Sequence, residues 1–313
     1  MLDAFGGTAS ISLLFKRHGK QVLYNDILKS NQIIATAIIE NDTVKATPED
    51  IEAVLQFSTN GYPSFIQKEY AGVYFVDEEN AWLDKMITNI VGVNNKYKKA
   101  IFLASLFQAC LAKRPFNLFH RANLSIRLAS VSRTFGNKTT WEQPFPDLLR
   151  RYVAEYNNAI FSNGRRNRVV GGLDAISAPN GVDLVYLDPP YFSARSSQGT
   201  NYLAFYHFLE GLTDYGNWPT RLSNSHGGVR RIPDSHEISR FVKKTEILSS
   251  FRKLLNRFRN NIIVLSYQSN GIPTKDEIEN MLYDLKKDVR IYSRPHQYVL
   301  SSHPNEELLF VAT

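Results

Sequence analysis

The stretch "VDLVYLDPPYFSARSSQGTNY", residues 182–202, carries the most informative pattern in this sequence. Its first six residues are mostly apolar with one acid, which is typical of a buried strand. The two prolines that follow, Pro189 and Pro190, oppose both a continued strand and an immediate helix. The chain is therefore expected to be held in one stiff conformation at a strand end, where open α/β sheets bind their ligands.

The segments on either side of this stretch predict an α/β fold. A strand over 2–5, a glycine turn and a helix over 10–18 precede a second strand over 21–24, which is how a parallel sheet opens. The other strands expected from apolar runs cover 168–171, 182–187, 261–267, 288–292 and 308–312, with helices over 27–39, 238–258 and 275–285.

The middle of the chain has a different pattern. Apolar residues at helical spacing predict helices over 48–57, 80–90, 98–111 and 148–161, separated by irregular aromatic stretches. We therefore expect a mostly helical insertion within the sheet domain. The expected division is a first sheet part over 1–45, the insertion over 46–164 and a second sheet part over 165–313.

Composition narrows the class of protein. The 313 residues are 43% hydrophobic and contain neither a long apolar run nor a signal-peptide pattern, so a cytoplasmic protein without membrane association is expected. The single cysteine, Cys110, can form neither an internal disulfide nor a cysteine metal site. The net charge of +7 is compatible with binding to nucleic acid but does not require it.

The glycine turn "DAFGGTA", residues 3–9, lies between a strand and a helix, where a ligand can approach the backbone; the alternative is that its glycines serve tight packing of the strand against the helix. Its spacing matches neither a dinucleotide fingerprint nor a phosphate-binding P-loop. Asp26 ends the next strand, where a carboxylate can accept hydrogen bonds from both hydroxyls of a ribose; the alternative is a helix N-cap. Asp174 follows another strand and could reach an adenine amino group, or be an ordinary turn residue.

The tetrapeptide DPPY, residues 188–191, suits one kind of chemistry. The exocyclic amino group of adenine or cytosine is a poor nucleophile because its lone pair is delocalised into the ring. Asp188 and the carbonyl of Pro189 can each accept one amino hydrogen, and Pro190 helps to fix them in place. Tyr191 offers a face on which a flipped-out base can stack, worth about 1–3 kcal/mol. A methyl group on a sulfonium would be the electrophile, with no metal required.

These segments together resemble the Dam-like class of adenine-specific DNA methyltransferases, of the restriction–modification type. "DAFGGTAS" (3–10) is similar to that class's D-x-F-x-G-x-G motif, "YND" (24–26) to its acidic strand end, and DPPY to its catalytic motif. "NEELLFVA" (305–312) resembles its closing strand. The resemblance implies a Rossmann-like sheet with helices on both faces, S-adenosylmethionine as the cofactor and an inserted module that recognises the target.

Carried over residue by residue, the resemblance assigns a site. The cofactor-binding residues would be Asp3, Phe5, Gly7, Asp26, Asp174 and Asp188, of which Phe5 and Gly7 would line the methionine end. The catalytic residues would be Asp188, Pro189, Pro190 and Tyr191. Ala9 stands where the class usually has glycine. The class also normally has a strand and helix before the first motif, which implies a truncated chain, a misassigned start or impaired activity.

Double-stranded DNA is the implied partner, with a cognate restriction endonuclease as a second. The candidates for phosphate contact within the insertion are interleaved with Phe116, Phe119 and Phe135; they are Lys113, Arg114, Arg121, Arg127, Arg133 and Lys138. Two further basic clusters are Arg165, Arg166 and Arg168, and Arg230 and Arg231. Each could instead be an ordinary solvated charge. Methylation of cytosine N4 or of an RNA base, and a non-catalytic DNA-binding protein, remain the alternatives to adenine N6.

Overall fold

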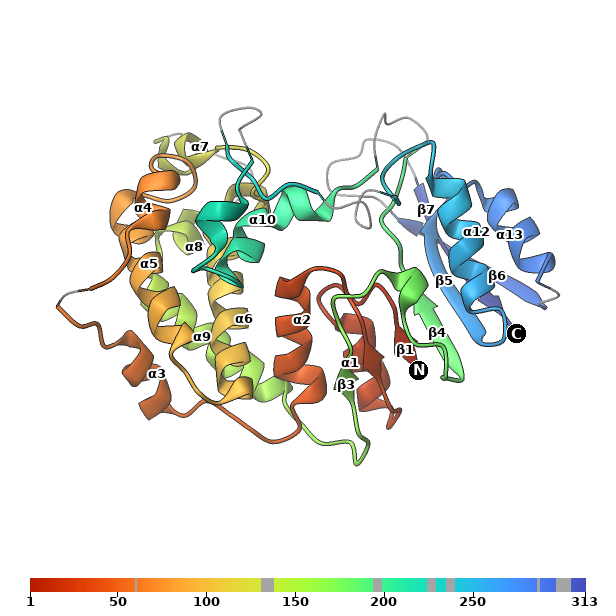
Figure 1. Ribbon diagram of the computed structural model, residues 1–313, viewed down its shortest axis with the longest axis horizontal. Helices are drawn as coiled ribbons and strands as arrows, with labels where there is room; N and C mark the ends of the chain where they lie inside the picture. The colour runs from red at the N-terminus through yellow and green to blue at the C-terminus, as the bar shows by residue number, and fades with distance from the viewer. Residues whose placement is uncertain are drawn as a thin grey trace. The chain divides into compact units, whose positions relative to one another are not determined.

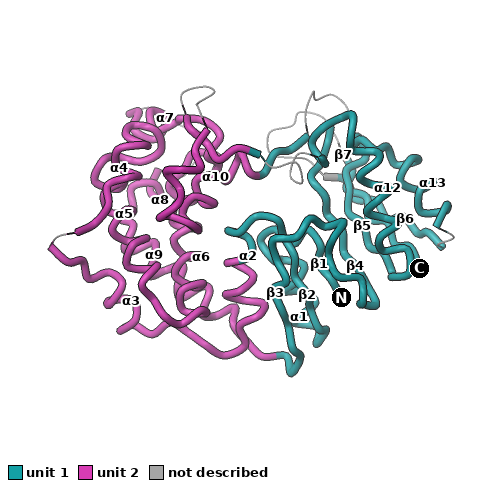
Figure 2. Tube along the Cα trace, in the orientation of Figure 1, with its two compact units in different colours: residues 1–32, 163–202, 234–313 teal, residues 33–162, 203–233 magenta. Residues whose placement is uncertain are grey.

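The computed structural model describes residues 1–59, 61–130, 138–193, 199–223, 229–234, 240–285, 288–296 and 305–313. The chain forms two compact units, coloured teal and magenta in Figure 2. We call residues 1–32, 163–202 and 234–313 the sheet unit, and residues 33–162 and 203–233 the helical unit.

The sheet unit confirms the expected α/β fold. Its described residues form a mixed seven-stranded sheet in the order β3-β2-β1-β4-β5-β7-β6 (Figure 1). The strands are β1 (Leu2–Asp3), β2 (Leu23–Tyr24), β3 (Arg168–Val169), β4 (Leu184–Leu187), β5 (Ile262–Gln268), β6 (Val289–His296) and β7 (Asn305–Ala312). The first five strands in the spatial order are parallel, whereas β7 is antiparallel to both β5 and β6.

The order of the strands creates a switch point between β1 and β4. The chain runs from β1 through β2 to β3 on one side, and then returns to add β4 on the other. The register pairs Leu2 with Val185 and Asp3 with Tyr186. The turn after β1 and the DPPY segment after β4 therefore leave the sheet at the same edge, where such folds bind ligands.

The core of the sheet unit lies between its strands and its amphipathic helices. Val185 and Leu187 alternate into the core from β4, and Ile263 and Leu265 do so from β5. The helices of this unit are α1 (Ser10–Arg17), η3 (Ala175–Ser177), α12 (Ile247–Arg257) and α13 (Lys275–Tyr283), and α2 (Lys29–Ala35) begins here. The helix expected over 238–258 is found over Ile247–Arg257, while residues 238–239 lie outside the described part of the chain. The Val242 carbonyl accepts a backbone hydrogen bond from the Gly199 amide at 3.0 Å instead of one from a following helical turn.

The helical unit confirms that the middle of the chain is mostly helical. Its longest described helix, α6 (Lys96–Ala112), buries residues on all sides, including Phe102 and Phe107, and packs against α9 (Phe145–Ala159). The further helices are η1 (Thr36–Glu40), α3 (Pro48–Leu55), α4 (Phe65–Glu69), α5 (Asp77–Val91), η2 (Pro115–Asn117), α7 (Leu124–Leu128), α8 (Lys138–Glu142), α10 (Tyr202–Leu212) and η4 (Trp218–Arg221). No helix of the described residues is long and apolar enough to cross a membrane.

The boundaries of the two units differ from those expected at 45/46 and 164/165. The helical unit begins at residue 33 and also takes in residues 203–233, which follow DPPY. The reason is packing. Ile38 and Ile39 of η1 are buried in this unit, where η1 contacts α6 and α9, and Phe208 of α10 stacks on Phe119 with ring centroids 5.0 Å apart.

Candidate active site

The glycine turn after β1 is shaped by the end of β2. A Cβ atom at Gly6 would lie 2.1 Å from the ring of Tyr24, so only glycine fits at that position. The Tyr24 hydroxyl donates to the carbonyl of Gly7 at 2.6 Å, and Gly7 has a φ of 51°. This positive φ favours glycine as well. The two glycines therefore let the turn close tightly against β2.

Ala9 ends the same turn in an unusual conformation. Its φ is 65°, in the left-handed region, and its side chain is completely buried. For a residue with a Cβ atom this conformation costs about 1–2 kcal/mol. The added methyl group is thus tolerated in space, but the backbone that it sits on is strained.

Asp26 joins the glycine turn to the end of β2. Its Oδ2 accepts a hydrogen bond from the Gly7 amide at 2.8 Å, and its Oδ1 accepts one from the Leu28 amide at 2.8 Å. The first bond holds the glycine turn. The second bond is a local turn contact rather than a helix N-cap, because α2 begins only at Lys29.

The neighbouring Asn25 was not singled out from the sequence. Its Nδ2 donates to the carbonyls of Ala4 and Leu173, both at 3.0 Å, and its Oδ1 accepts from the Leu173 amide at 3.3 Å. Asn25 thus ties the end of β1 to the segment after β3. Its only sequence signal is a polar side chain beside Asp26 at a strand end.

Asp3 is a buried acid at the end of β1. Its Oδ2 accepts a hydrogen bond from the Ser12 hydroxyl at 2.7 Å, while its Oδ1 is buried without a partner among the described residues. Burial raises the pKa of Asp3 to about 7, and the nearby carboxylates of Asp188 and Asp26 add to the rise, against the effect of the Ser12 hydrogen bond. A positively charged group beside Asp3 would therefore stabilise its ionised form.

Asp188 leaves β4 at the same edge of the sheet. Burial raises its pKa to about 7; a hydrogen bond from the Tyr191 side chain opposes this rise, and the negative charge of Glu307 adds to it. Pro189 is buried directly after it. The edge therefore carries two acids, Asp3 and Asp188, whose ionised forms both lack a compensating cation among the described residues.

Tyr191 is held by side chains from β5 and β7. Its hydroxyl donates to Oε2 of Glu307 at 3.0 Å and lies 3.4 Å from the Ser266 hydroxyl. Its ring meets the ring of Tyr267 edge-on, with centroids 5.3 Å apart. Glu307 was not singled out from the sequence, because a strand acid far along the chain carries no signal that it returns to DPPY.

Two further cofactor candidates lie near this edge with protein partners. Asp174 caps η3 by accepting from the Ile176 amide at 3.2 Å, and its Oδ2 pairs with Nη1 of Arg240 at 2.7 Å. Phe5 meets Phe241 edge-on, with ring centroids 5.3 Å apart. No cluster of three or more metal-binding acids, histidines or cysteines occurs among the described residues.

The candidates for phosphate contact belong to the helical unit and differ in exposure. The Arg114 side chain is buried, donates to the carbonyls of Leu118 and Arg121, and lies 4.3 Å from the centre of the Tyr74 ring. Arg121, in contrast, is exposed, and Lys138 is exposed with a weak ion pair to Glu142. Arg133 lies outside the described residues.

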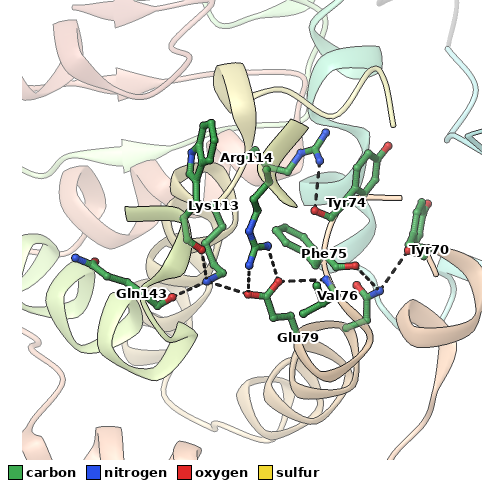
Figure 3. A network of polar contacts seen from close by, with 11 residues as sticks. Tyr70, Tyr74, Phe75, Val76, Glu79, Lys113, Arg114 and Gln143 are labelled. Atoms are coloured by element: carbon green, nitrogen blue, oxygen red, sulfur yellow. Dashed lines mark hydrogen bonds and ion pairs between the residues drawn. The ribbon is translucent and has the colours of Figure 1, made fainter. Parts of the chain in front are cut away.

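Arg127 also points inward. Its guanidinium forms a bidentate ion pair with Glu79, which accepts a further contact from Lys113 at 2.9 Å. Figure 3 shows Glu79 between Lys113 and the start of α5, where the Val76 amide donates to the same carboxylate at 3.2 Å. Arg114 and Arg127 therefore make contacts inside the helical unit and do not face the solvent. This differs from what was expected of residues that contact DNA phosphates.

Comparison of the sequence with known proteins provides separate evidence about the family. A family model described as D12 class N6 adenine-specific DNA methyltransferase matches residues 1–281. The chain is 31% identical to Type II methyltransferase M2.HphI of Haemophilus parahaemolyticus, over 99% of this chain and 89% of that protein. It is 26% identical to Type II methyltransferase M.FokI of Planomicrobium okeanokoites, over 97% of this chain but 46% of that longer protein.

A third relative is modification methylase StsI of Streptococcus sanguinis, which is 24% identical over 99% of this chain and 47% of its own length. The chain therefore spans about half of each of the two longer relatives. No solved structure matches the chain significantly.

Proposed function

Because this chain belongs to the D12 class of N6 adenine-specific DNA methyltransferases, we propose that it takes its methyl group from S-adenosylmethionine, bound at the carboxyl ends of β1 and β4. When bound, this cofactor supplies a methyl group on a positively charged sulfonium. One observation carries the proposal. Asp3 and Asp188 lie at this edge with pKa values raised to about 7, as expected for carboxylates that await a cation.

The remaining residues of the edge fit the same ligand. Asp26 lies at the end of β2 with its carboxylate against the Gly7 amide, which is the place where a strand-end acid meets the hydroxyls of a ribose. Phe5 offers an apolar surface towards the methionine end. The proposed contact of Asp174 with the cofactor adenine requires it to share its carboxylate with Arg240.

DPPY is proposed to act on the target base. Asp188 and the Pro189 carbonyl accept the two hydrogens of the adenine amino group, which localises the lone pair of its nitrogen. Pro190 keeps these acceptors in place, and Tyr191 stacks on the base once it has left the duplex. Asp188 must be ionised to accept the hydrogen bond from the adenine amino group. A cation bound nearby favours this ionised form.

For the DNA itself we propose contacts from the exposed part of the helical unit. Arg121 supplies a phosphate contact, with the exposed Lys138 as a further candidate. Arg133, outside the described residues, is proposed from the sequence alone. Phe116 is half exposed and has a φ of 64° in the short turn that precedes Arg121. An apolar ring held outward in a strained turn is suited to contact with unstacked bases.

The relatives' names place the chain among methyltransferases of restriction–modification systems. We propose that its biological partner is a restriction endonuclease which cuts the same DNA site when that site is unmodified. A DNA substrate is also in keeping with the cytoplasmic location expected from the sequence.

The test of the proposed donor is a binding and transfer experiment on the purified chain. Calorimetry with S-adenosylmethionine is expected to show binding that weakens at least about tenfold in Asp26→Asn, because a charged acceptor for the ribose becomes neutral. Label from the methyl group should reach adenine N6 in DNA, and Asp188→Ala should abolish transfer while DNA binding persists. A chain that methylates DNA without binding this cofactor would refute the proposal.

A further inference from the structure

The hydroxyl of Tyr191 is surrounded by acceptors from three different segments. It lies 3.0 Å and 3.3 Å from the two carboxylate oxygens of Glu307 on β7, and 3.4 Å from the hydroxyl of Ser266 on β5. The Asp188 carboxyl, three residues earlier in the chain, also interacts with the Tyr191 side chain, which lowers the pKa of Asp188. The Tyr191 hydroxyl thus joins the DPPY segment after β4 to β7, which lies two places away in the sheet.

A phenol has one hydrogen to donate, so two carboxylates compete for it. When Glu307 accepts that hydrogen, Asp188 does not receive it. A hydrogen bond to a carboxylate is roughly twice as strong as one to a neutral acceptor. Removing the charge of Glu307 would therefore favour donation of the Tyr191 hydroxyl hydrogen to Asp188.

We propose that Glu307 is a positioning residue for methyl transfer: it takes the hydroxyl hydrogen of Tyr191 and so leaves Asp188 free to accept from the target amino group. This inference rests on the proposed roles of Asp188 and Tyr191. The same contact fixes the plane of the Tyr191 ring, since a ring held at its hydroxyl and edge-on against Tyr267 cannot tilt away from a stacked base.

The place of Glu307 in the sheet suits this role. It pairs with Gln268 in the antiparallel register of β5 and β7. Leu308 and Phe310 beside it are buried in the core, which anchors the strand. A carboxylate on a strand held in this way loses little freedom when it binds Tyr191, so the contact is maintained without reorganisation.

Glu307 also acts on Asp188 through its charge. The titratable groups that interact with Asp188 among the described residues are Asp3, Tyr186, Tyr191 and Glu307. Since the negative charge of Glu307 favours the protonated form of Asp188, its removal should move the acid limb of the pH–rate profile to lower pH. A residue that merely stabilises the strand would leave this limb unchanged.

A double-mutant cycle tests the proposal. The full chain, Glu307→Gln, Tyr191→Phe and the double variant are assayed for methyl transfer to DNA at a pH on the plateau. Glu307→Gln should lower kcat about tenfold when Tyr191 is present and less than about twofold when residue 191 is phenylalanine, because the route through the hydroxyl is then already lost. KM for DNA should stay within about twofold in each case.

The matched control is Glu306→Gln, the neighbouring exposed acid on β7, which should leave kcat unchanged. An equal fall in kcat in both backgrounds would overturn the inference, since Glu307 would then act without Tyr191. If Glu307→Gln does not fold, Glu307→Asp takes its place in the cycle, because the shorter side chain keeps the negative charge but moves it away from the Tyr191 hydroxyl. Loss of transfer in the unaltered chain would instead count against the proposed function, which keeps the two failures distinct.

Discussion

At the scale of single residues, the site depends on charges that the folded chain leaves uncompensated. Asp3 and Asp188 were both predicted from motifs, but only the structure shows that their raised pKa values share one cause, burial at the same edge of the sheet. A buried carboxyl of this kind lowers the stability of the folded chain, because its ionised form is disfavoured until a cation binds beside it.

This destabilisation predicts a pH-dependent gain in stability for Asp188→Asn. The pKa of Asp188 is about 7 in the folded chain and about 4 when unfolded, so the unfolded chain loses this proton first and wild-type stability falls as pH rises between these values. The amide has no charge to bury. Calorimetry should therefore show a higher Tm for the variant at about pH 8 and no gain near pH 4. A gain of equal size at both pH values would contradict the assigned cause.

Ala9 gives a second prediction at this scale. Ala9→Gly removes a left-handed strain of about 1–2 kcal/mol, but it loses a buried methyl group worth about 0.8 kcal/mol and adds about 0.4–1 kcal/mol of unfolded-state entropy, so stability is expected to stay within about 0.5 kcal/mol of the wild type. Urea unfolding measures it. The control is Ala35→Gly, where φ is −64° and glycine should cost about 1 kcal/mol. Equal losses in both variants would show that the turn is not strained.

At the scale of elements, the helical unit separates arginines that look alike in the sequence. Arg114 and Arg121 lie seven residues apart in the same basic, aromatic stretch. The first is buried over the Tyr74 ring and donates to backbone carbonyls, whereas the second is exposed. Composition could predict that this stretch meets DNA, but it could not predict which cations the fold turns inward.

The two arginines therefore predict opposite results. Arg114→Met should destabilise the chain, by about 1–3 kcal/mol for each carbonyl left without a donor, as measured by denaturant unfolding. Arg121→Ala should leave stability within about 0.5 kcal/mol but lower the salt dependence of DNA binding by about one phosphate contact. An Arg121→Ala variant with an unchanged salt slope would remove it from the proposed interface.

At the scale of the whole molecule, the alternation of strands and helices was sufficient to predict the sheet, the insertion and the order of the motifs. The boundaries of the insertion were not predictable in the same way. Residues 203–233 come after DPPY in the chain, yet Phe208 stacks on Phe119 and His207 lies 2.8 Å from the Tyr74 hydroxyl, so this segment completes the helical unit. Such contacts join residues more than eighty positions apart and leave no local pattern.

The sequence by itself determined the class of chemistry, because an acid, two prolines and an aromatic ring at a strand end fix acceptors for an amino group wherever the rest of the chain runs. It also determined the α/β fold, since hydrophobic periodicity is a local property. Only the tertiary structure decided that Glu307 meets Tyr191, that Arg114 is buried and that Asp3 lies beside Asp188. Each depends on which strands become neighbours, and that follows from packing of the whole sheet.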